Sequence, residues 1–474
     1  MSAIYCWPQS VYANEDVQIY AHCEHEGEGR VRVTRVGREN NVVRDIEGVE
    51  LVRQAIPHDA ASEGCNWRIT TTLRADLETG FYLVEVINEV ETSFGFFVVK
   101  PSTVVDAMLV LSTSTWAAYN NWGGPSFYTG GHTSSLKRPL PPGFLSKNNL
   151  QRFRLARLQD WTPIEHKAFA SKGYSQWSMA AGWANWEYLF VQWAEAAGYK
   201  LGFATSQDLI DDPEVLDQTN LYLSVGHDEY WTREMRDCVE NFVDHGGNAA
   251  FFSGNVAFWQ ARLEADKLVC YKMKPEEDPL AGTELTTTMW SDPLVGRPEN
   301  EMTGVSFTRG GYARMNHSPM GTGGYRVQHP EHWAFANTEL QRDGLVGANA
   351  VVVGYECDGC AVENRRGEIV PTHLDGTPEG FQILAHAPAR LWETKHLPQA
   401  LRDDYVGELN WVAERVFGED SSDNRALLQT GYAVMGTFQR GQGTVFTTGC
   451  TDWAYGLSDP QVAQITKNVL DYLA

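Results

Sequence analysis

Three adjacent ionisable residues, His227, Asp228 and Glu229, follow the apolar run 221–225. An apolar run of this length is typical of a buried strand, and Gly226 predicts a turn directly after it. An imidazole and two carboxylates in one turn provide a proton carrier and hard metal ligands. We therefore predict that this turn takes part in acid–base chemistry or in metal binding.

A second apolar run, 249–252, ends in another polar cluster that contains Ser253 and Asn255. Between the two runs we predict a helix that Thr232 caps and that glycines 246 and 247 end. The apolar residues of this helix fall at helical spacing: Met235, Val239, Phe242 and Val243. Strands joined by a helix usually pair in parallel and end at the same edge of a sheet. We expect Glu229 and Asn255 to face one crevice, where open α/β sheets bind ligands.

The composition excludes several classes of function. The 474 residues carry a formal charge of -23, from 38 basic and 61 acidic side chains. Nucleic acids and anionic membranes attract basic surfaces, so neither is expected as a partner. The first ten residues lack the pattern of a secretion signal, and no apolar stretch is long enough to cross a bilayer. We expect a cytoplasmic protein whose eight cysteines are mostly reduced thiols.

Two domains are predicted. Residues 1–100 alternate short β-rich runs with turn signals, which predicts a small antiparallel β-sandwich of immunoglobulin-like type. Residues 101–474 alternate apolar strands with helices, which predicts an α/β catalytic domain with a mostly parallel sheet flanked by helices. A long irregular insertion is expected around 256–350. Its neighbour, the apolar run 350–353, is predicted to be a strand that ends in a charged turn at 354–360.

An aromatic loop, 112–128, is predicted after the buried strand 107–111. It contains Tyr119 and Tyr128. A tyrosine binds a metal only as phenolate, so the ion must lower a pKa of about 10, as a trivalent ion such as Fe(III) can. The structural alternatives are that both tyrosines pack with a polar tip outward and that Glu229 serves as an acid at a helix N-terminus.

Two nucleophile motifs are weaker candidates. Ser253 lacks the Gly-x-Ser-x-Gly elbow of a serine hydrolase. The pair Cys357-x-x-Cys360 lacks the second pair of ligands that a structural zinc site needs. We expect both to be structural.

Four motifs together resemble a known family, the large (β) subunit of N,N-dimethylformamidase and its relatives. They are residues 221–231 (LYLSVGHDEYW), 246–255 (GGNAAFFSGN), 115–119 (TWAAY) and 449–453 (GCTDW). The resemblance implies a catalytic domain similar to the glutamine-amidotransferase fold. It also implies a mononuclear ferric ion held by two tyrosines and one glutamate.

By motif, the family's site residues fall on named positions here. The glutamate ligand is Glu229 with His227 beside it, the tyrosine ligands are Tyr119 and Tyr128, with Tyr188 and Tyr230 as alternatives for the second, and further site residues are Asn255 and Glu356. The resemblance implies that His227 or Glu356 transfers the proton and that Asn255 donates to the developing oxyanion. The expected activity is hydrolysis of a small amide, N-alkylated or not, to a carboxylate and an amine.

Partners and alternatives follow from the same motifs. We expect Fe(III) as cofactor, with zinc or another divalent metal as the alternative, and a homo-oligomer that leaves room for a small accessory subunit. The competing functions are a non-catalytic protein whose aromatic cleft binds a sugar or another small molecule, and a hydrolase that uses a different metal.

Overall fold

The computed structural model describes residues 2–315, 318, 321–393 and 409–474, and the chain forms two compact units. Unit 1 comprises Met1–Leu150, Pro163–Thr219 and Leu263–Val269, and unit 2 comprises Gln151–Thr162, Asn220–Arg262 and Cys270–Ala474. The predicted domain boundary at residue 100 stays a prediction. No helix in the described part of the chain is long and apolar enough to cross a membrane.

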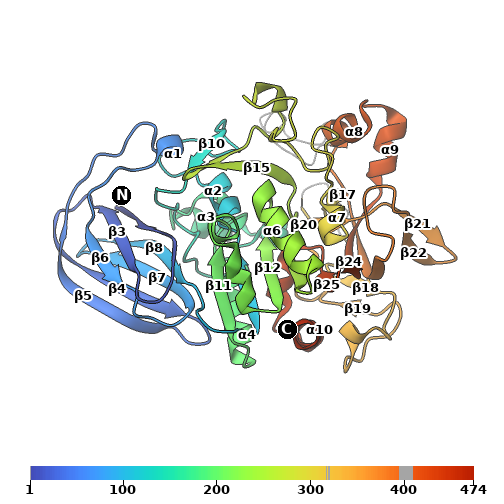
Figure 1. The fold of residues 1–474 in the computed structure, drawn as a ribbon, viewed down its shortest axis with the longest axis horizontal. Coiled ribbons are helices and arrows are strands. Elements are labelled where there is room, and N and C mark those ends of the chain that lie inside the picture. Colours follow the sequence, from blue (N-terminus) through green and yellow to red (C-terminus); the bar gives the residue numbers. More distant parts are fainter. Residues whose placement is uncertain (1, 316–317, 319–320, 394–408) are drawn as a thin grey trace. The chain divides into compact units, whose positions relative to one another are not determined.

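The first hundred residues of unit 1 contain two sheets, with the strand orders β1-β3-β6 and β2-β8-β7-β4-β5 (Figure 1). Their strands are β1 (Ala3–Trp7), β2 (Ser10–Val11), β3 (Asp16–His22), β4 (Gly27–Val36), β5 (Asn41–Leu51), β6 (Thr71–Arg74), β7 (Gly80–Ile87) and β8 (Thr92–Val99). Buried and half-buried residues alternate along 30–34 of β4 and 82–87 of β7, and Val31, Val33 and Val84 lie in one core with Val17 and Ile19 of β3.

The rest of unit 1 carries a parallel pair of strands and short helices. The elements are β9 (Ala107–Leu111), β10 (Thr133–Ser135), β11 (Leu201–Thr205), β16 (Lys267–Val269), α1 (Ala60–Glu63), α2 (Thr113–Tyr119), α3 (Pro163–Ala170), α4 (Glu187–Ala196), α5 (Asp208–Asp211) and the 3-10 turns η2 (Gln176–Met179) and η3 (Pro213–Gln218). Strands β9 and β11 pair in parallel. The prediction of a continuous loop at 112–128 is wrong, because α2 occupies its first half. No glycine or proline interrupts residues 112–122, and Ala117 and Ala118 favour a helix.

Unit 2 contains a mixed sheet with the strand order β12-β14-β25-β24-β23-β18-β19 (Figure 1). The strands of the unit are β12 (Leu221–His227), β13 (Tyr230–Thr232), β14 (Asn248–Gly254), β15 (Trp259–Glu264), β17 (Ser306–Tyr312), β18 (Tyr325–Val327), β19 (Leu345–Val346), β20 (Glu356–Gly359), β21 (Val362–Arg365), β22 (Glu368–Pro371), β23 (Gln382–Ala389), β24 (Gly431–Arg440) and β25 (Gly443–Thr447). Its helices are η1 (Leu155–Asp160), α6 (Arg233–Asp244), η4 (Pro275–Glu277), α7 (Asn300–Thr303), η5 (Trp333–Phe335), α8 (Leu409–Phe417), α9 (Ser422–Gln429), η8 (Thr451–Gly456) and α10 (Pro460–Leu473). Helix α6 packs on β14 and β25, and α10 packs on β14.

The prediction of a mostly parallel sheet flanked by helices is wrong. Strands make up 31% of the structure and helices 24%, and antiparallel pairs outnumber parallel ones among the described strands. In unit 2, β12, β14 and β25 are parallel, whereas β25, β24 and β23 are antiparallel neighbours. A tight turn with Gly441 at φ 54° joins β24 to β25, and such a hairpin needs no covering helix. A mixed, strand-rich fold therefore replaces the predicted glutamine-amidotransferase-like sheet.

The strand–helix–strand unit predicted for 221–255 is confirmed. Strands β12 and β14 pair in parallel, with His227 opposite Gly254. The Thr232 hydroxyl accepts a hydrogen bond from the Met235 N–H at 3.3 Å and caps α6. Val239 and Val243 of α6 are buried. The two polar strand ends consequently lie at one edge of the sheet.

The predicted strand at 350–353 is wrong. This apolar run forms a turn, in which Val351 has φ 58° in the left-handed region, and the strand β20 follows at the residues predicted to be a turn. Strand β20 pairs antiparallel with β17, with Glu356 opposite Tyr312. Glu356 therefore has a strand position, and its side chain shares a face with the residue two positions further on.

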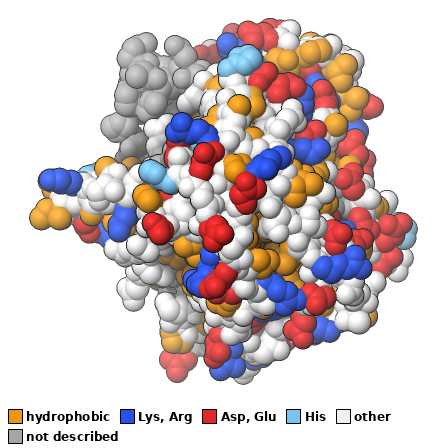
Figure 2. Space-filling view, turned by 90° about the vertical axis from the view of Figure 1, so that its left-hand side faces the viewer, with side chains coloured by type: hydrophobic (Ala, Val, Ile, Leu, Met, Phe, Trp, Pro, Cys, Tyr) orange, Lys and Arg blue, Asp and Glu red, His pale blue; other side chains and the backbone are white. Residues whose placement is uncertain are grey.

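Acidic and basic side chains are interspersed on the face of the molecule drawn in Figure 2, with apolar side chains between them. Opposite charges that lie close together largely cancel each other's field, and salt screens what remains beyond about 10 Å. The described part of this face therefore presents mixed charge and not a field of one sign.

Candidate active site

The ends of β12 and β14 bring His227 and Asn255 together in unit 2. His227 is the last residue of β12, and Asn255 follows β14 with φ 51°, a left-handed conformation that asparagine tolerates. The residue before it must be glycine, since a Cβ on Gly254 would lie 2.6 Å from the Thr451 backbone nitrogen. The close approach of these two backbones sets the position from which the Asn255 side chain leaves the sheet.

Glu356 and Glu229 complete a buried cluster around the imidazole of His227. The His227 Nε2 atom lies 2.7 Å from Glu356 Oε2 and 3.3 Å from Glu229 Oε2. The Asn255 amide nitrogen Nδ2 donates to Glu356 Oε2 at 3.1 Å and lies 3.4 Å from His227 Nε2. All four residues are at most 3% exposed. An imidazole and a carboxylate at this distance can exchange a proton, which is the requirement for general acid–base catalysis.

Sequence reasoning missed Trp259, which holds Glu229. Its indole Nε1 donates to Glu229 Oε1 at 2.9 Å, and its backbone N–H donates to the Glu229 carbonyl at 3.0 Å. The only signal in the sequence is the apolar and aromatic run 256–259 directly after Asn255. Glu229 is therefore oriented by a partner in the strand β15 and is not a freely rotating acid.

Sequence reasoning also missed Asp358, which holds the backbone of Asn255. Its Oδ1 accepts from the Asn255 N–H at 2.9 Å, and its Oδ2 accepts from the Val256 N–H at 3.1 Å. Asp358 is two residues beyond Glu356 in β20, so both carboxyl groups lie on one face of the strand. One strand therefore contacts Asn255 twice, at its side chain and at its backbone. Burial raises the pKa of Asp358 to about 8, although the two N–H groups lower it.

The variant Asp358→Asn tests whether the Asp358 carboxyl group is protonated in the folded protein. The measured quantity is the pH dependence of the free energy of unfolding. The folded protein keeps the Asp358 proton up to pH of about 8, whereas an unfolded chain loses it near pH 3.9. Between these values the folded state binds one more proton, so the stability of the wild type falls as pH rises, by up to about 1.4 kcal/mol per pH unit. The variant lacks this proton. The difference in unfolding free energy between wild type and variant, measured in urea across this range, is expected to shrink or reverse towards high pH.

A control and a contradicting result complete this test. The exposed Asp217→Asn variant is the control, and its unfolding free energy is expected to differ from that of the wild type by the same amount at every pH. A difference in unfolding free energy between the wild type and Asp358→Asn that does not change with pH would contradict the protonation of Asp358 in the folded protein.

Tyr119 and Tyr128 lie together in unit 1. Tyr119 is the last residue of α2 and is buried, and Tyr128 is half-buried. Their rings stack with centroids 4.2 Å apart and an interplanar angle of 26°. The ring of Trp177 packs against both, at 5.7 Å from Tyr119 and 5.1 Å from Tyr128. The structure therefore places the two predicted tyrosines side by side within this unit.

A buried arginine fixes the chain after Tyr119. Arg138 Nη2 donates to the Asn120 carbonyl at 2.9 Å, its Nη1 donates to the Trp122 carbonyl, and its Nε donates to the Ser135 carbonyl at 3.3 Å. Burial lowers the pKa of Arg138 to about 9. Because the Arg138 guanidinium donates hydrogen bonds to three backbone carbonyls, it anchors the loop and so sets where α2 ends.

The alternative tyrosines lie elsewhere in the secondary structure. Tyr188 is in α4 and meets the ring of Trp183 edge-on at 6.4 Å. Tyr230 is fully buried in β13, directly after Glu229. The predicted ligands Tyr119 and Tyr128 belong to unit 1 and Glu229 belongs to unit 2, and the ligand set as a whole stays a prediction. Within the described residues, no group of three or more His, Cys, Asp and Glu side chains has the arrangement of a metal site.

The side chains of the two nucleophile motifs, Ser253 and the pair Cys357 and Cys360, are buried. Ser253 Oγ lies 2.8 Å from Ser224 Oγ, which donates to Asp228 Oδ2 at 2.7 Å. Cys357 and Cys360 are free, buried thiols, and burial raises the pKa of each well above its ordinary value. A thiol that resists ionisation is a poor nucleophile and a poor metal ligand.

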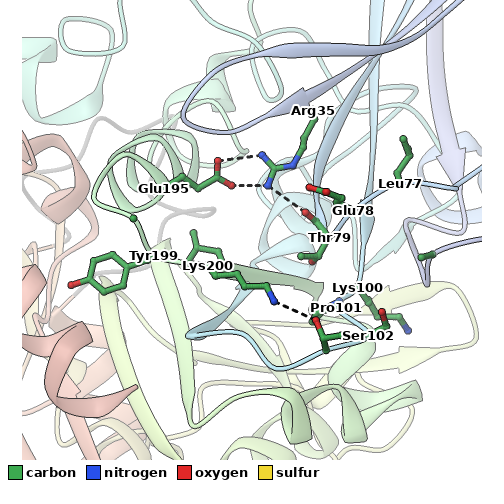
Figure 3. Close-up of a pocket in the computed structure, with 14 residues that line it drawn as sticks. Arg35, Leu77, Glu78, Thr79, Lys100, Pro101, Ser102, Glu195, Tyr199 and Lys200 are labelled. Atoms are coloured by element: carbon green, nitrogen blue, oxygen red, sulfur yellow. Dashed lines mark hydrogen bonds and ion pairs between the residues drawn. The ribbon is translucent and has the colours of Figure 1, made fainter.

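Unit 1 also contains a cavity of ≈ 570 Å³ that is lined by other residues than those of the predicted site (Figure 3). Arg35 in this cavity pairs with both carboxylate oxygens of Glu195, at 3.2 and 2.8 Å, and Lys200 Nζ donates to Thr103 Oγ1 at 3.3 Å. None of the described residues that line it is a predicted site residue. Arg35 is paired with Glu195, and no predicted site residue lines the cavity, so it does not carry the predicted chemistry.

Comparisons with known proteins point to one family. A family model described as N,N-dimethylformamidase beta subunit-like, C-terminal, matches residues 18–467. The N,N-dimethylformamidase beta subunits of Alcaligenes sp and of Paracoccus aminophilus are each 23% identical to this chain over 350 residues. The matched part is 64% of this chain and 43% of each relative, so the chain spans less than half the length of these relatives. The resemblance drawn from the four motifs is thereby confirmed.

Proposed function

Because the chain belongs to the N,N-dimethylformamidase beta subunit-like, C-terminal family, we propose that it hydrolyses a small amide to a carboxylate and an amine with a mononuclear Fe(III) ion as cofactor. The buried cluster in unit 2 carries the proposal: His227 Nε2 lies 2.7 Å from Glu356 and 3.3 Å from Glu229. The names of the relatives support cleavage of a C–N bond outside peptides. Zinc or another divalent ion is the alternative cofactor.

The donor atoms fit a hard cation. Tyr119, Tyr128 and Glu229 are the proposed ligands, and all three offer oxygen, which hard cations prefer. In unit 2 the buried residues Asp228, Glu229 and Glu356 place carboxyl groups at one strand end. Carboxylate oxygens are ligands that hard cations prefer. When bound, such an ion polarises the amide carbonyl and lowers the pKa of water.

His227 and Glu356 are the proposed proton carriers. Their reacting atoms lie 2.7 Å apart, and both side chains are buried. The pair is placed to take a proton from the attacking water and to return it to the departing amine nitrogen. The Asn255 Nδ2 atom is directed at Glu356, which supports a role in orienting this carboxylate.

An assay of the full chain with a panel of small amides tests the proposal. The expected result is amine release from at least one amide by the iron-loaded protein. Binding of amides or sugars without release would favour the non-catalytic binding protein. Hydrolysis by iron-free protein loaded with zinc would instead support the alternative cofactor.

An assembly with further chains is part of the proposal. The relatives are named as beta subunits, which supports a complex with at least one other kind of subunit. We also propose homo-oligomerisation and a cytoplasmic location. Light scattering on the purified chain measures its oligomeric state directly.

A further inference from the structure

The sheet β2-β8-β7-β4-β5 of unit 1 buries aromatic side chains on both of its faces. Tyr82 of β7 and Phe97 of β8 stack with ring centroids 5.1 Å apart and lie in the core that this sheet shares with β3. Phe81 and Phe96 come one position earlier in the same two strands, so their side chains point to the opposite face. Both residues are at most 4% exposed. Another part of unit 1 therefore covers this second face of the sheet.

Two tryptophans from later in unit 1 form this cover. The ring of Phe81 stacks on Trp183, with centroids 3.8 Å apart and an interplanar angle of 2°. The ring of Phe96 meets Trp116 at 5.3 Å and 65°, an edge-to-face arrangement that aromatic pairs prefer. Both tryptophans are 1% exposed. The sheet is thus packed on both faces, and its outer face contacts the segment that carries Tyr119.

Trp116 lies in α2, three positions before Tyr119. Residues three apart in a helix are neighbours on its surface, so the two side chains belong to one side of α2. The indole Nε1 of Trp116 also donates to Oε1 of the buried Glu187 at 3.3 Å. Helix α2 has seven residues, and helices shorter than about 12 residues are marginal on their own. Contacts with the rest of unit 1 therefore decide where α2 lies, and Tyr119 with it.

We infer that the N-terminal sandwich positions Tyr119: Phe96 supports Trp116, and Trp116 fixes the side of α2 to which Tyr119 belongs. Phe96 and Trp116 are positioning residues that act through Tyr119. Tyr119 stacks on Tyr128 with centroids 4.2 Å apart, so a displacement of α2 changes the geometry of this pair. The sandwich is then part of the scaffold of the candidate site and not a separate binding module. Its consequence for iron binding rests on the proposed function.

Two adjacent phenylalanines of β8 provide a matched test in the full chain. Phe96→Leu removes the ring that contacts Trp116, whereas Phe97→Leu removes an equal ring that stacks on Tyr82 at the other face. With fluorotyrosine incorporated, fluorine NMR of the iron-free protein reports on the tyrosines, and the resonances of Tyr119 and Tyr82 are those missing from Tyr119→Phe and Tyr82→Phe. We expect the Tyr119 resonance to move in Phe96→Leu alone and the Tyr82 resonance to move in Phe97→Leu.

This pair of variants distinguishes positioning from a general loss of stability. A Tyr119 resonance that stays in place in Phe96→Leu would overturn the inference. A Tyr119 resonance that moves equally in Phe96→Leu and Phe97→Leu would overturn it as well, because loosening of the sandwich would then be sufficient. Phe96→Ala leaves a larger gap against Trp116 and is expected to move the resonance further. If that variant does not fold, the two leucine variants still decide the inference.

Iron binding by the same variants separates this inference from the proposed function. Partners that orient a metal ligand typically contribute 10- to 100-fold to metal affinity, so Phe96→Leu is expected to bind iron about 10-fold more weakly than the wild type. Phe97→Leu is expected to bind iron like the wild type. If the wild type binds no iron, the proposed cofactor fails, and the fluorine resonances of the iron-free protein alone decide whether the sandwich positions Tyr119.

Discussion

Glu229→Ala is expected to remove bound iron and amide hydrolysis together. Glu229 is the proposed carboxylate ligand, and it is buried with Oε1 oriented by the Trp259 indole at 2.9 Å. Loss of a partner outside the ligand set typically costs 10- to 100-fold in metal affinity or activity, so loss of a ligand is expected to cost more than about 100-fold. Iron per chain, measured by elemental analysis, and amine release in the same preparation provide the two readouts.

A second variant separates charge from shape at this position. Glu229→Gln keeps the volume and an oxygen that can accept from Trp259, but it removes the negative charge. It is expected to lose iron nearly as completely as the alanine variant, since a neutral amide is a weak ligand for a trivalent ion. The exposed Glu379→Ala variant is the control and is expected to match the wild type. Retention of both iron and activity in Glu229→Ala would contradict the ligand assignment.

His227→Ala is expected to lower kcat by about 10²- to 10⁴-fold, the range that loss of a general acid–base group produces. Its Nε2 lies 2.7 Å from Glu356 Oε2, so the variant removes the proton carrier and leaves this carboxylate with the Asn255 amide as a remaining partner. Bound iron is expected to fall far less than in Glu229→Ala, because His227 is not a proposed ligand and contacts the proposed ligand Glu229 through its Nε2 atom, at 3.3 Å.

The combination of these two readouts defines the role of His227. The exposed His245→Ala variant controls for the loss of an imidazole as such. Parallel loss of iron and activity in His227→Ala would mean that the imidazole binds the metal, and it would contradict its role as proton carrier.

Patterns among sequence neighbours are sufficient to predict the core of the site. The apolar runs of β12 and β14, the cap at Thr232 and the helical spacing in α6 all depend on residues close in the chain. Together they predict parallel strands that end at one edge, with Glu229 and Asn255 facing one crevice, and the register of β12 with β14 confirms the shared edge. Glu356 joins this edge from far along the chain, and it was identified through the family resemblance and not through local pattern.

The remaining contacts join segments that lie far apart in the chain. The spacing of apolar residues does not indicate which distant segments pair. Trp259 reaches Glu229 across 30 positions, and Asp358 reaches Asn255 across 103. The position of Asp358 follows from the pairing of β20 with β17, and residues 354–360 predicted a turn there. The antiparallel half of the unit 2 sheet was missed for the same reason, because apolar runs such as β24 and β25 fit parallel and antiparallel neighbours equally well.

The visible absorption spectrum of the purified iron-loaded protein tests whether tyrosinates hold a ferric ion. Phenolate ligands give Fe(III) a charge-transfer band, so we expect a coloured protein whose band disappears in Tyr119→Phe. A matched Tyr188→Phe variant is expected to keep the band. A colourless protein that hydrolyses amides without iron, or a band that survives in Tyr119→Phe, would contradict the proposed ferric tyrosinate site.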